Sequence, residues 1–141
     1  MFINYTDKEA ELLARTMRAE ALNEGELGML MVGNVIANRV VANCYIFKNT
    51  RTISDVIYQK NQFSGINSPL FQAKPTALEK RLAERILRGE DYYPATHALW
   101  FYAPQNSEEN CIPNWYNQNL AGKYKSHCFY KPNPGECQEI Y

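Results

Sequence analysis

The sequence predicts an α+β fold in which four helices are followed by a small antiparallel sheet. Capping motifs and apolar residues at helical spacing recur up to Arg88. After Pro94, two short runs consist mainly of residues that favour strands. A chain of 141 residues is expected to form one domain, residues 1–141. A domain of this size can bury roughly 68–70% of its unfolded surface.

The first helix is predicted to begin at a capping box. Thr6 occupies the N-cap position and Glu9 lies three residues later, so each side chain can bond the backbone of the other. The helix is expected to run to about Glu24, because Gly25 favours a helix C-terminus.

The second helix, about residues 26–41, is predicted to be the central core helix because it is apolar on most sides. It contains Gly28 and Gly33, which are poor helix formers. We expect these glycines to allow the close approach of another backbone.

Two further helices are predicted, one starting near Thr52 and one over about residues 76–88. Between them, residues 62–64 are expected to form a short strand. The last helix should end at Gly89. Its apolar stripe is predicted to comprise Leu78, Leu82, Ile86 and Leu87.

The sheet is predicted from residues 98–102 and from an antiparallel returning strand at residues 127–130. A long polar loop is expected between them. Of the neighbours Trp100 and Phe101, alternation along the strand places one inward as plain core.

The charge balance excludes some classes of protein. The chain has 15 Lys and Arg against 15 Asp and Glu, whereas a nucleic-acid-binding domain is normally basic. Its longest apolar stretch, around residues 29–35, is too short to span a membrane. No signal peptide is recognisable at the N-terminus, so we expect synthesis in the cytosol without the usual export route.

The cysteines are predicted to be structural rather than catalytic. None of Cys44, Cys111, Cys128 and Cys137 forms a Cys-x-x-Cys pair. Buried reduced thiols, a late-formed disulfide and a Cys/His metal cluster remain open alternatives, and no metal site is assigned. His127 and Cys128 should point to opposite faces of a strand, so they should not form a nucleophile–base pair.

Glu20 is the leading candidate for a catalytic residue. Leu13, Met17 and Glu20 fall at i, i+4 and i+7, which places a carboxyl group on an apolar helical stripe. Desolvation should raise its pKa, and the nearby Glu24 and the helix C-terminus should act in the same direction. A carboxylic acid that stays protonated near neutral pH can serve as a general acid.

Other interpretations of these carboxylates remain open. Glu20 could instead be a half-buried partner of Arg18 or Arg39 in a structural ion pair. Glu24 is a possible second carboxylate, because most glycoside hydrolases use two. We favour a solvent-facing position for Glu24 at the fraying end of the helix.

The chain is rich in aromatic side chains that lie next to amides. It has 10 Tyr, 6 Phe and 2 Trp. Aromatic rings can cover the C–H face of a sugar, and amides can bond its hydroxyl and N-acetyl groups. Core or surface packing is the alternative role for these rings. The residues predicted to bind a glycan are Gln62, Phe63, Trp100, Tyr102 and Tyr116.

Short motifs along the chain follow an order that is typical of one enzyme family. They are Leu13-Ala14-Arg15, Glu20-Ala21, Glu24-Gly25, Gly33-Asn34-Val35, Asn38-Arg39, Ile57-Tyr58-Gln59, Gln62-Phe63, Leu99-Trp100-Phe101-Tyr102 and His127-Cys128-Phe129-Tyr130. In these motifs the chain resembles the SleB/CwlJ-type cell-wall hydrolases of bacterial spore germination, over about residues 6–141. Ala42-Asn43-Cys44 and residues 114–118 and 125–130 are most similar to the CwlJ branch.

The resemblance implies a helical lysozyme-like or transglycosylase-like domain with a small antiparallel sheet, no cofactor and one catalytic glutamate, at the position of Glu20. The implied substrate is spore cortex peptidoglycan that carries muramic-δ-lactam. The family further implies a location in the spore coat and the coat protein GerQ as partner. Because no export signal is recognisable and the implied substrate lies outside the forespore membrane, we expect synthesis in the mother cell, followed by docking at the boundary of coat and cortex. A peptidoglycan amidase or a non-catalytic coat or glycan-binding module are the alternatives.

A coat partner needs an exposed apolar surface on which to dock. The candidate surface is the aromatic C-terminal region, with Phe129, Tyr130, Pro132 and Tyr141.

Overall fold

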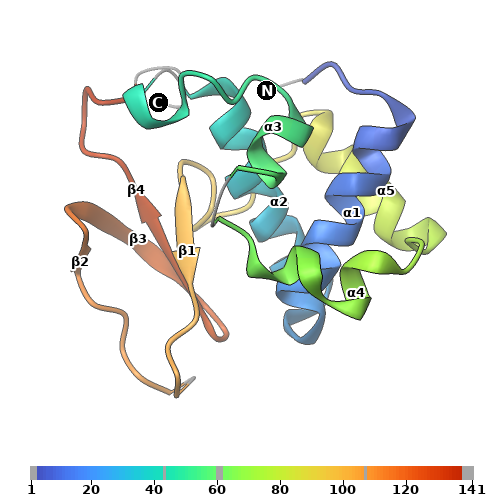
Figure 1. The fold of residues 1–141 in the computed structure, drawn as a ribbon. Helices are drawn as coiled ribbons and strands as arrows, with labels where there is room; N and C mark the ends of the chain where they lie inside the picture. The colour runs from blue at the N-terminus through green and yellow to red at the C-terminus, as the bar shows by residue number, and fades with distance from the viewer. Residues whose placement is uncertain (1–2, 43, 60–61, 107, 138–141) are drawn as a thin grey trace.

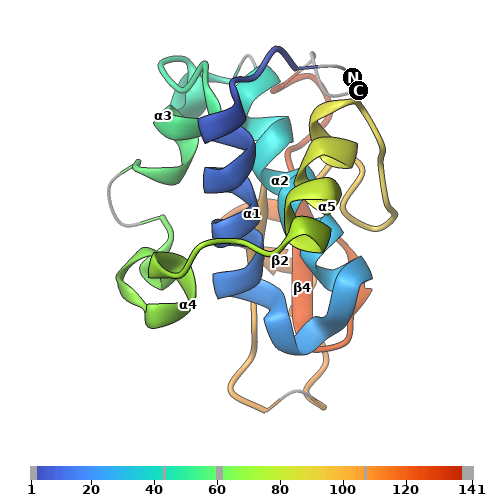
Figure 2. The same cartoon turned by 90° about the vertical axis from the view of Figure 1, so that its right-hand side faces the viewer.

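The computed structural model describes residues 3–42, 44–59, 62–106 and 108–137. Its helices gather on one side of the molecule and a four-stranded sheet stands on the other (Figure 1). Seen from the helical side, the helices Asp7–Ala21 (α1), Gly25–Val41 (α2) and Ala77–Leu87 (α5) lie in front of the strands (Figure 2). The predicted α+β class is therefore confirmed.

Helix α1 begins at the predicted capping box. The Glu9 backbone N–H donates to the Thr6 hydroxyl over 3.2 Å, and the Thr6 backbone N–H donates to the Glu9 carboxylate over 3.1 Å. The α-helix ends at Ala21, earlier than predicted, and Leu22–Glu24 continue as a 3₁₀ turn, η1. Gly25 follows with φ +78°, a backbone conformation that favours glycine.

Helix α2 is the buried central helix that the sequence predicts. A Cβ on Gly33 would lie 3.0 Å from Ile86 Cγ1 and 3.0 Å from Met17 Sδ. A Cβ on Gly28 would meet the Glu24 side chain. The glycines therefore give room to neighbouring side chains, and the predicted approach of another backbone is wrong.

Polar side chains of α2 hold the segment that leads into the sheet. The Tyr92 backbone N–H donates to Asn34 Oδ1 over 2.8 Å. Asn38 Nδ2 donates to the carbonyl of Ala98 over 2.8 Å. These bonds position residues 92–98, and hence the strand that follows them, against the helical layer.

The remaining helices are short except for α5. Ile53–Ile57 (α3) starts after Thr52 as predicted. Residues 62–64 do not form the predicted strand, because Ser64–Asn67 form a 3₁₀ helix (η3) and Pro69–Gln72 form α4. Helix α5 matches its prediction, although Leu78 is 41% exposed and lies outside the buried stripe.

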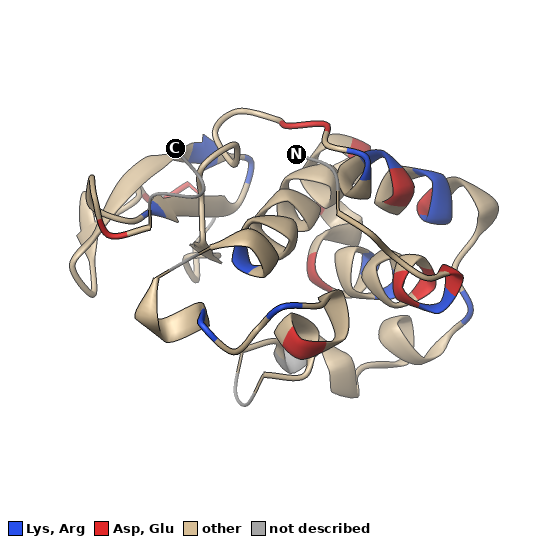
Figure 3. Ribbon diagram, turned by 90° about the horizontal axis from the view of Figure 1, so that it is seen from above, with Lys and Arg blue, Asp and Glu red and all other residues tan. Residues whose placement is uncertain are grey.

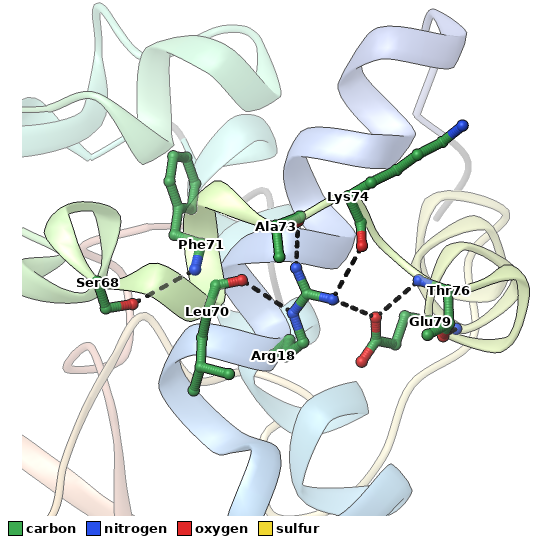
Figure 4. Close-up of polar contacts among 8 residues, drawn as sticks. All are labelled: Arg18, Ser68, Leu70, Phe71, Ala73, Lys74, Thr76 and Glu79. Atoms are coloured by element: carbon green, nitrogen blue, oxygen red, sulfur yellow. Dashed lines mark hydrogen bonds and ion pairs between the residues drawn. The ribbon is translucent and has the colours of Figure 1, made fainter.

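The segment from α4 to the start of α5 is held in place by Arg18 of α1 (Figure 4). The buried guanidinium donates to three backbone carbonyls and also pairs with Glu79 on α5. The carbonyls belong to Leu70, Ala73 and Lys74. One side chain thus fixes the chain from α4 to the start of α5.

The sheet has the strand order β1-β4-β3-β2, with all neighbours antiparallel. The predicted pairing of Trp100–Tyr102 (β1) with His127–Lys131 (β4) is confirmed. Asn114–Trp115 (β2) and Gln118–Tyr124 (β3) lie in the segment that we expected to be a polar loop. Their two-residue turn has positive φ at both positions, 49° and 69°, as in a type I′ hairpin.

The four cysteines form two disulfides, Cys44–Cys137 and Cys111–Cys128. This outcome replaces the alternatives of free thiols and a metal cluster. Cys128 bonds Cys111, whereas the neighbouring His127 packs against the Phe101 ring at 5.1 Å between centroids. The predicted separation of His127 from Cys128 on a strand is therefore confirmed.

The candidate docking surface at the C-terminus is wrong. Phe129 and Tyr130 are fully buried, since β4 lies between β1 and β3 in the sheet. Pro132 is also buried, and Tyr141 lies outside the described residues.

Acidic and basic residues are interspersed along the helices (Figure 3). None of the helices in the described part of the chain has the length and hydrophobicity that a membrane crossing requires.

Candidate active site

A cleft of about 590 Å³ runs between the helical layer and β1. Because β1 is an edge strand, side chains from both of its faces can reach this cleft. The cleft brings together all but one of the predicted site residues. Those present are Glu20, Gln62, Phe63, Trp100, Tyr102 and Tyr116.

Glu20 lies at the end of α1, half-buried at the wall of the cleft. Leu13 and Met17 on the same stripe are buried in the core, as predicted. Desolvation raises the pKa of Glu20 above 4.5, and a hydrogen bond from the Gly65 backbone partly offsets this rise. Repulsion from Glu24, which we also expected, is not among the causes of the shift.

Gly65 allows this contact because it has no side chain. A Cβ at this position would lie 3.1 Å from Glu20 Oε1, closer than nine in ten real Cβ contacts. The backbone of η3 can therefore approach the carboxyl group of α1 directly.

Neither predicted arginine partner binds Glu20 among the contacts of the described residues. Arg18 is engaged with Glu79 and the α4 segment. Arg39 donates to the Leu99 carbonyl over 2.7 Å and to Gln62 Oε1 over 2.9 Å. The interpretation of Glu20 as one half of an ion pair is therefore not supported.

Arg39 is buried between two aromatic rings at the base of the cleft. Its guanidinium carbon lies 5.0 Å from the centroid of Phe47 and 5.2 Å from that of Phe63. Desolvation lowers the pKa of Arg39 to about 10. Arg39 thus joins α2, the residue that precedes β1 and the Gln62 segment around the cleft.

Phe63 borders the cleft but belongs mainly to the core. It is 4% exposed, and its ring contacts both Arg39 and Phe101. Phe63 lines the cleft as predicted, but little of its ring is exposed to it, and its role in glycan binding stays a prediction. Gln62, in contrast, is exposed.

The opposite wall is built from aromatic rings of the sheet. The rings of Trp115 and Tyr102 lie 4.9 Å apart, and each also contacts Tyr130. Trp100 packs on Phe47 at 6.0 Å. Tyr116, at the tip of the β2–β3 hairpin, is 79% exposed and remains available to a ligand.

Glu24 is not the solvent-facing residue that we favoured. It is buried at 7% exposure beside a smaller hollow of about 210 Å³, which Glu20 and His127 also line. Its Oε1 accepts bonds from the backbone N–H and the hydroxyl of Ser126. His127 Nδ1 lies 3.4 Å from the same oxygen. These partners on the β3–β4 turn and β4 cover the end of the helix.

Several residues of the cleft were missed by the sequence prediction. They are Arg39, Ile46, Phe101, Ala103, Trp115, Gln118 and His127. Trp115 had a usable signal, since it precedes Tyr116 in an aromatic and amide-rich segment. Within the described residues, no group of three or more His, Cys, Asp or Glu side chains is arranged to hold a metal ion.

Residues 23–130 match the family model described as Cell Wall Hydrolase. The chain belongs to this family. The matched segment begins after Glu20 and includes Glu24 and His127. Membership confirms the resemblance that the sequence motifs indicated.

Two relatives of this cell wall hydrolase are similar over nearly their full length. The protein named cell wall hydrolase CwlJ from Oceanobacillus iheyensis is 44% identical over 140 residues, which cover 99% of this chain and 97% of the relative. CwlJ from Bacillus subtilis is 42% identical over 139 residues, covering 99% and 96%. A spore cortex-lytic enzyme of Bacillus cereus is 25% identical over 127 residues, covering 90% of this chain but 46% of that enzyme.

Solved structures share the fold of this cell wall hydrolase. The catalytic domain of Bacillus cereus SleB aligns with a TM-score of 0.71 and 23% identity, covering 91% of this chain and 93% of that one. The catalytic domain of the germination-specific lytic transglycosylase SleB from Bacillus anthracis aligns with a TM-score of 0.72 and 23% identity, covering 91% and 98%.

Proposed function

We propose that this cell wall hydrolase cuts the glycan strand of spore cortex peptidoglycan during germination, with Glu20 as its catalytic glutamate. The observation that carries the proposal is the half-buried Glu20 at the wall of the large cleft, with its pKa raised by desolvation. The names of the CwlJ relatives support a cell wall substrate, and the name of the spore cortex-lytic enzyme supports the cortex in particular.

The chemistry starts with a protonated Glu20. Its carboxyl group donates a proton to the glycosidic oxygen, and the bond between that oxygen and C1 of muramic acid breaks. In a lytic transglycosylase the 6-hydroxyl of the same sugar then attacks C1, which leaves a 1,6-anhydro end and consumes no water. In a muramidase, water attacks instead. The simplest form of the first mechanism uses one group, because the Glu20 carboxylate can take the proton of the 6-hydroxyl.

The walls of the cleft suit a chain of sugars. The rings of Trp115 and Tyr116 can cover C–H faces of the sugars, and the Gln62 and Gln118 amides can bond N-acetyl and hydroxyl groups.

The proposal is tested on purified cortex peptidoglycan that carries muramic-δ-lactam, with the released fragments identified by mass spectrometry. Glu20→Gln should fold normally and lose nearly all activity. The matched control is Glu26→Gln, which changes an exposed carboxylate of α2. Anhydro ends indicate the transglycosylase reaction and reducing ends indicate hydrolysis. Release of peptides without glycan cleavage, or full activity of Glu20→Gln, would refute the proposal.

We also propose that the enzyme works at the boundary of spore coat and cortex, where the coat protein GerQ holds it. This rests on the family resemblance alone. Co-purification of GerQ with the full-length chain from spore coats would support it, whereas normal retention of the enzyme in coats that lack GerQ would contradict it.

A further inference from the structure

We propose that His127 is a second catalytic residue of this cleft, which accepts the proton of the attacking hydroxyl or water, and that Glu24 positions its imidazole for this task. The inference rests on the proposed function, and it adds a separate proton acceptor to the acid Glu20. It gives a role to a buried carboxylate and a buried histidine that the one-group mechanism does not use.

The position of His127 is the first argument. It begins β4 and packs edge-on against the Phe101 ring at 5.1 Å. His127 lines both the large cleft and the smaller hollow, and Glu20 lines the same two spaces. The imidazole and the proposed acid therefore border the same volume from different layers, since one comes from the sheet and the other from α1.

The burial of Glu24 is the second argument. A carboxylate that is removed from water needs bonding partners, and Glu24 has them on one oxygen. The Ser126 backbone N–H donates to Oε1 over 2.9 Å, and the Ser126 hydroxyl donates to the same atom. The Lys125 ammonium donates to the Glu24 backbone carbonyl over 3.0 Å. The carboxylate is thus fixed in place beside His127.

The contact between Glu24 and His127 is the third argument. Nδ1 of His127 is buried and makes no hydrogen bond to any described residue, and Glu24 Oε1 lies 3.4 Å away. This distance is long for a hydrogen bond, as is common for catalytic pairs before substrate binds. A proton on Nδ1 directed at Glu24 leaves Nε2 as the acceptor, so the carboxylate selects the tautomer that a base requires.

The charges around the imidazole fit this role. Burial lowers the pKa of His127 below 6.5, and the charge of Glu24 partly offsets the change. The other charged or titratable groups nearby are Glu20 on α1, Lys125 on the β3–β4 turn and Tyr124, the cross-strand neighbour of His127 on β3. His127 is therefore neutral near neutral pH and able to accept a proton, which the Glu24 carboxylate then stabilises as imidazolium.

The reaction balances with this acceptor. Glu20 gives its proton to the leaving oxygen as the bond to C1 breaks, and the attacking oxygen forms a new bond to C1. The proton of that oxygen goes to His127. Transfer of this proton through solvent in the cleft to the Glu20 carboxylate restores both groups. A purely structural His127 would brace β4 against η1 and would take no part in this cycle.

The dependence of kcat/KM on pH separates the two roles. Wild-type activity should fall at low pH as His127 becomes protonated and at high pH as Glu20 ionises. His127→Gln should lower kcat by roughly 100-fold or more with little change in KM, and it should remove the acid limb. Glu24→Gln keeps an oxygen for Ser126, so it should fold. This variant should move the acid limb to lower pH, because loss of the negative charge lowers the pKa of His127.

The control is His97→Gln, which changes an exposed histidine and should leave the pH profile unchanged. If His127→Gln does not fold, His127 is titrated by NMR in the wild type and in Glu24→Gln. The proposal requires the pKa of His127 to be lower in Glu24→Gln, and it requires the acid limb of kcat/KM to shift by the same amount. A folded His127→Gln with wild-type kcat, or an acid limb that does not follow the His127 titration, overturns the inference. If the inference on His127 fails but Glu20→Gln has lost activity on cortex peptidoglycan, the proposed function still stands. A wild-type protein without activity on cortex peptidoglycan would instead refute the proposed function itself.

Discussion

Arg18 on α1 and Glu79 on α5 form a buried ion pair, with 2.8 Å between Nη1 and Oε1 (Figure 4). The same Glu79 oxygen accepts the Thr76 backbone N–H at the start of α5. One carboxylate therefore caps a helix and neutralises the cation that holds α4.

Arg18→Met should destabilise the fold by roughly 3–5 kcal/mol, because it leaves Glu79 buried without its partner and frees the carbonyls of the α4 segment. Urea unfolding measures this loss. The control Arg88→Met removes an exposed contact with Glu84 at 3.8 Å, and it should cost less than about 1 kcal/mol. Equal losses in the two variants would contradict the importance of the buried pair.

Ionisation of Glu20 should make the fold less stable. Its pKa is higher in the fold than its ordinary value of 4.5, so the folded protein holds the proton more tightly than the unfolded chain. The stabilisation is complete below pH 4.5 and is lost as the pH rises through the raised pKa. Glu20→Gln cannot ionise, so its Tm relative to wild type should be higher at pH 7 than at pH 4. A pH-independent difference in Tm would show that desolvation does not govern Glu20.

Tyr116→Ala should weaken glycan binding more than it weakens the fold. The ring is 79% exposed at the hairpin tip, so little packing is lost. Loss of an aromatic contact should raise KM by roughly 2- to 10-fold. The control is Tyr93→Ala, an 80% exposed tyrosine outside the cleft lining, and its KM should not change. Kinetics on soluble cortex fragments measure both, and matching KM values would argue against a role for Tyr116 in binding.

Removal of either disulfide should destabilise the oxidised protein by roughly 2–4 kcal/mol. The Cys44–Cys137 bridge spans 93 residues of sequence and the Cys111–Cys128 bridge spans 17. Because the longer loop loses more entropy when it is closed in the unfolded chain, the double alanine variant at Cys44 and Cys137 should lose more stability. Denaturant unfolding of the two double variants tests the order, and titration of the unreduced wild type should find no free thiol.

Local signals were enough to predict most of the helices. Thr6 and Thr52 cap helices where the sequence indicated helix starts, because a capping box needs only neighbouring residues. Thr76, which we placed at the start of the last helix, is its N-cap. The short helices between Ser64 and Gln72 were not predicted. The bond that holds α4 at Leu70 comes from the guanidinium of Arg18, which is distant in the sequence.

In the candidate site, too, features that follow from local sequence patterns could be predicted, and features that depend on residues distant in the sequence could not. Glu20 could be found from a helical stripe, which is a local pattern. The burial of Glu24 depends on Ser126 and His127, which lie more than 100 residues later in the chain. The near-complete burial of Phe63 could not be predicted, because nothing near it in the sequence shows that Arg39 and Phe101 lie against its ring.

The contact of Gly65 with Glu20 makes the strength of the acid depend on the position of a loop. The Gly65 amide lowers the pKa of Glu20, and Gln62 in the same segment is held by Arg39 on α2. Any displacement of this segment, including one caused by a bound glycan, removes the stabilisation of the carboxylate and makes Glu20 a weaker acid that keeps its proton to higher pH. The pH optimum of this enzyme can therefore be tuned at residues 62–65 without altering the helix that carries the acid.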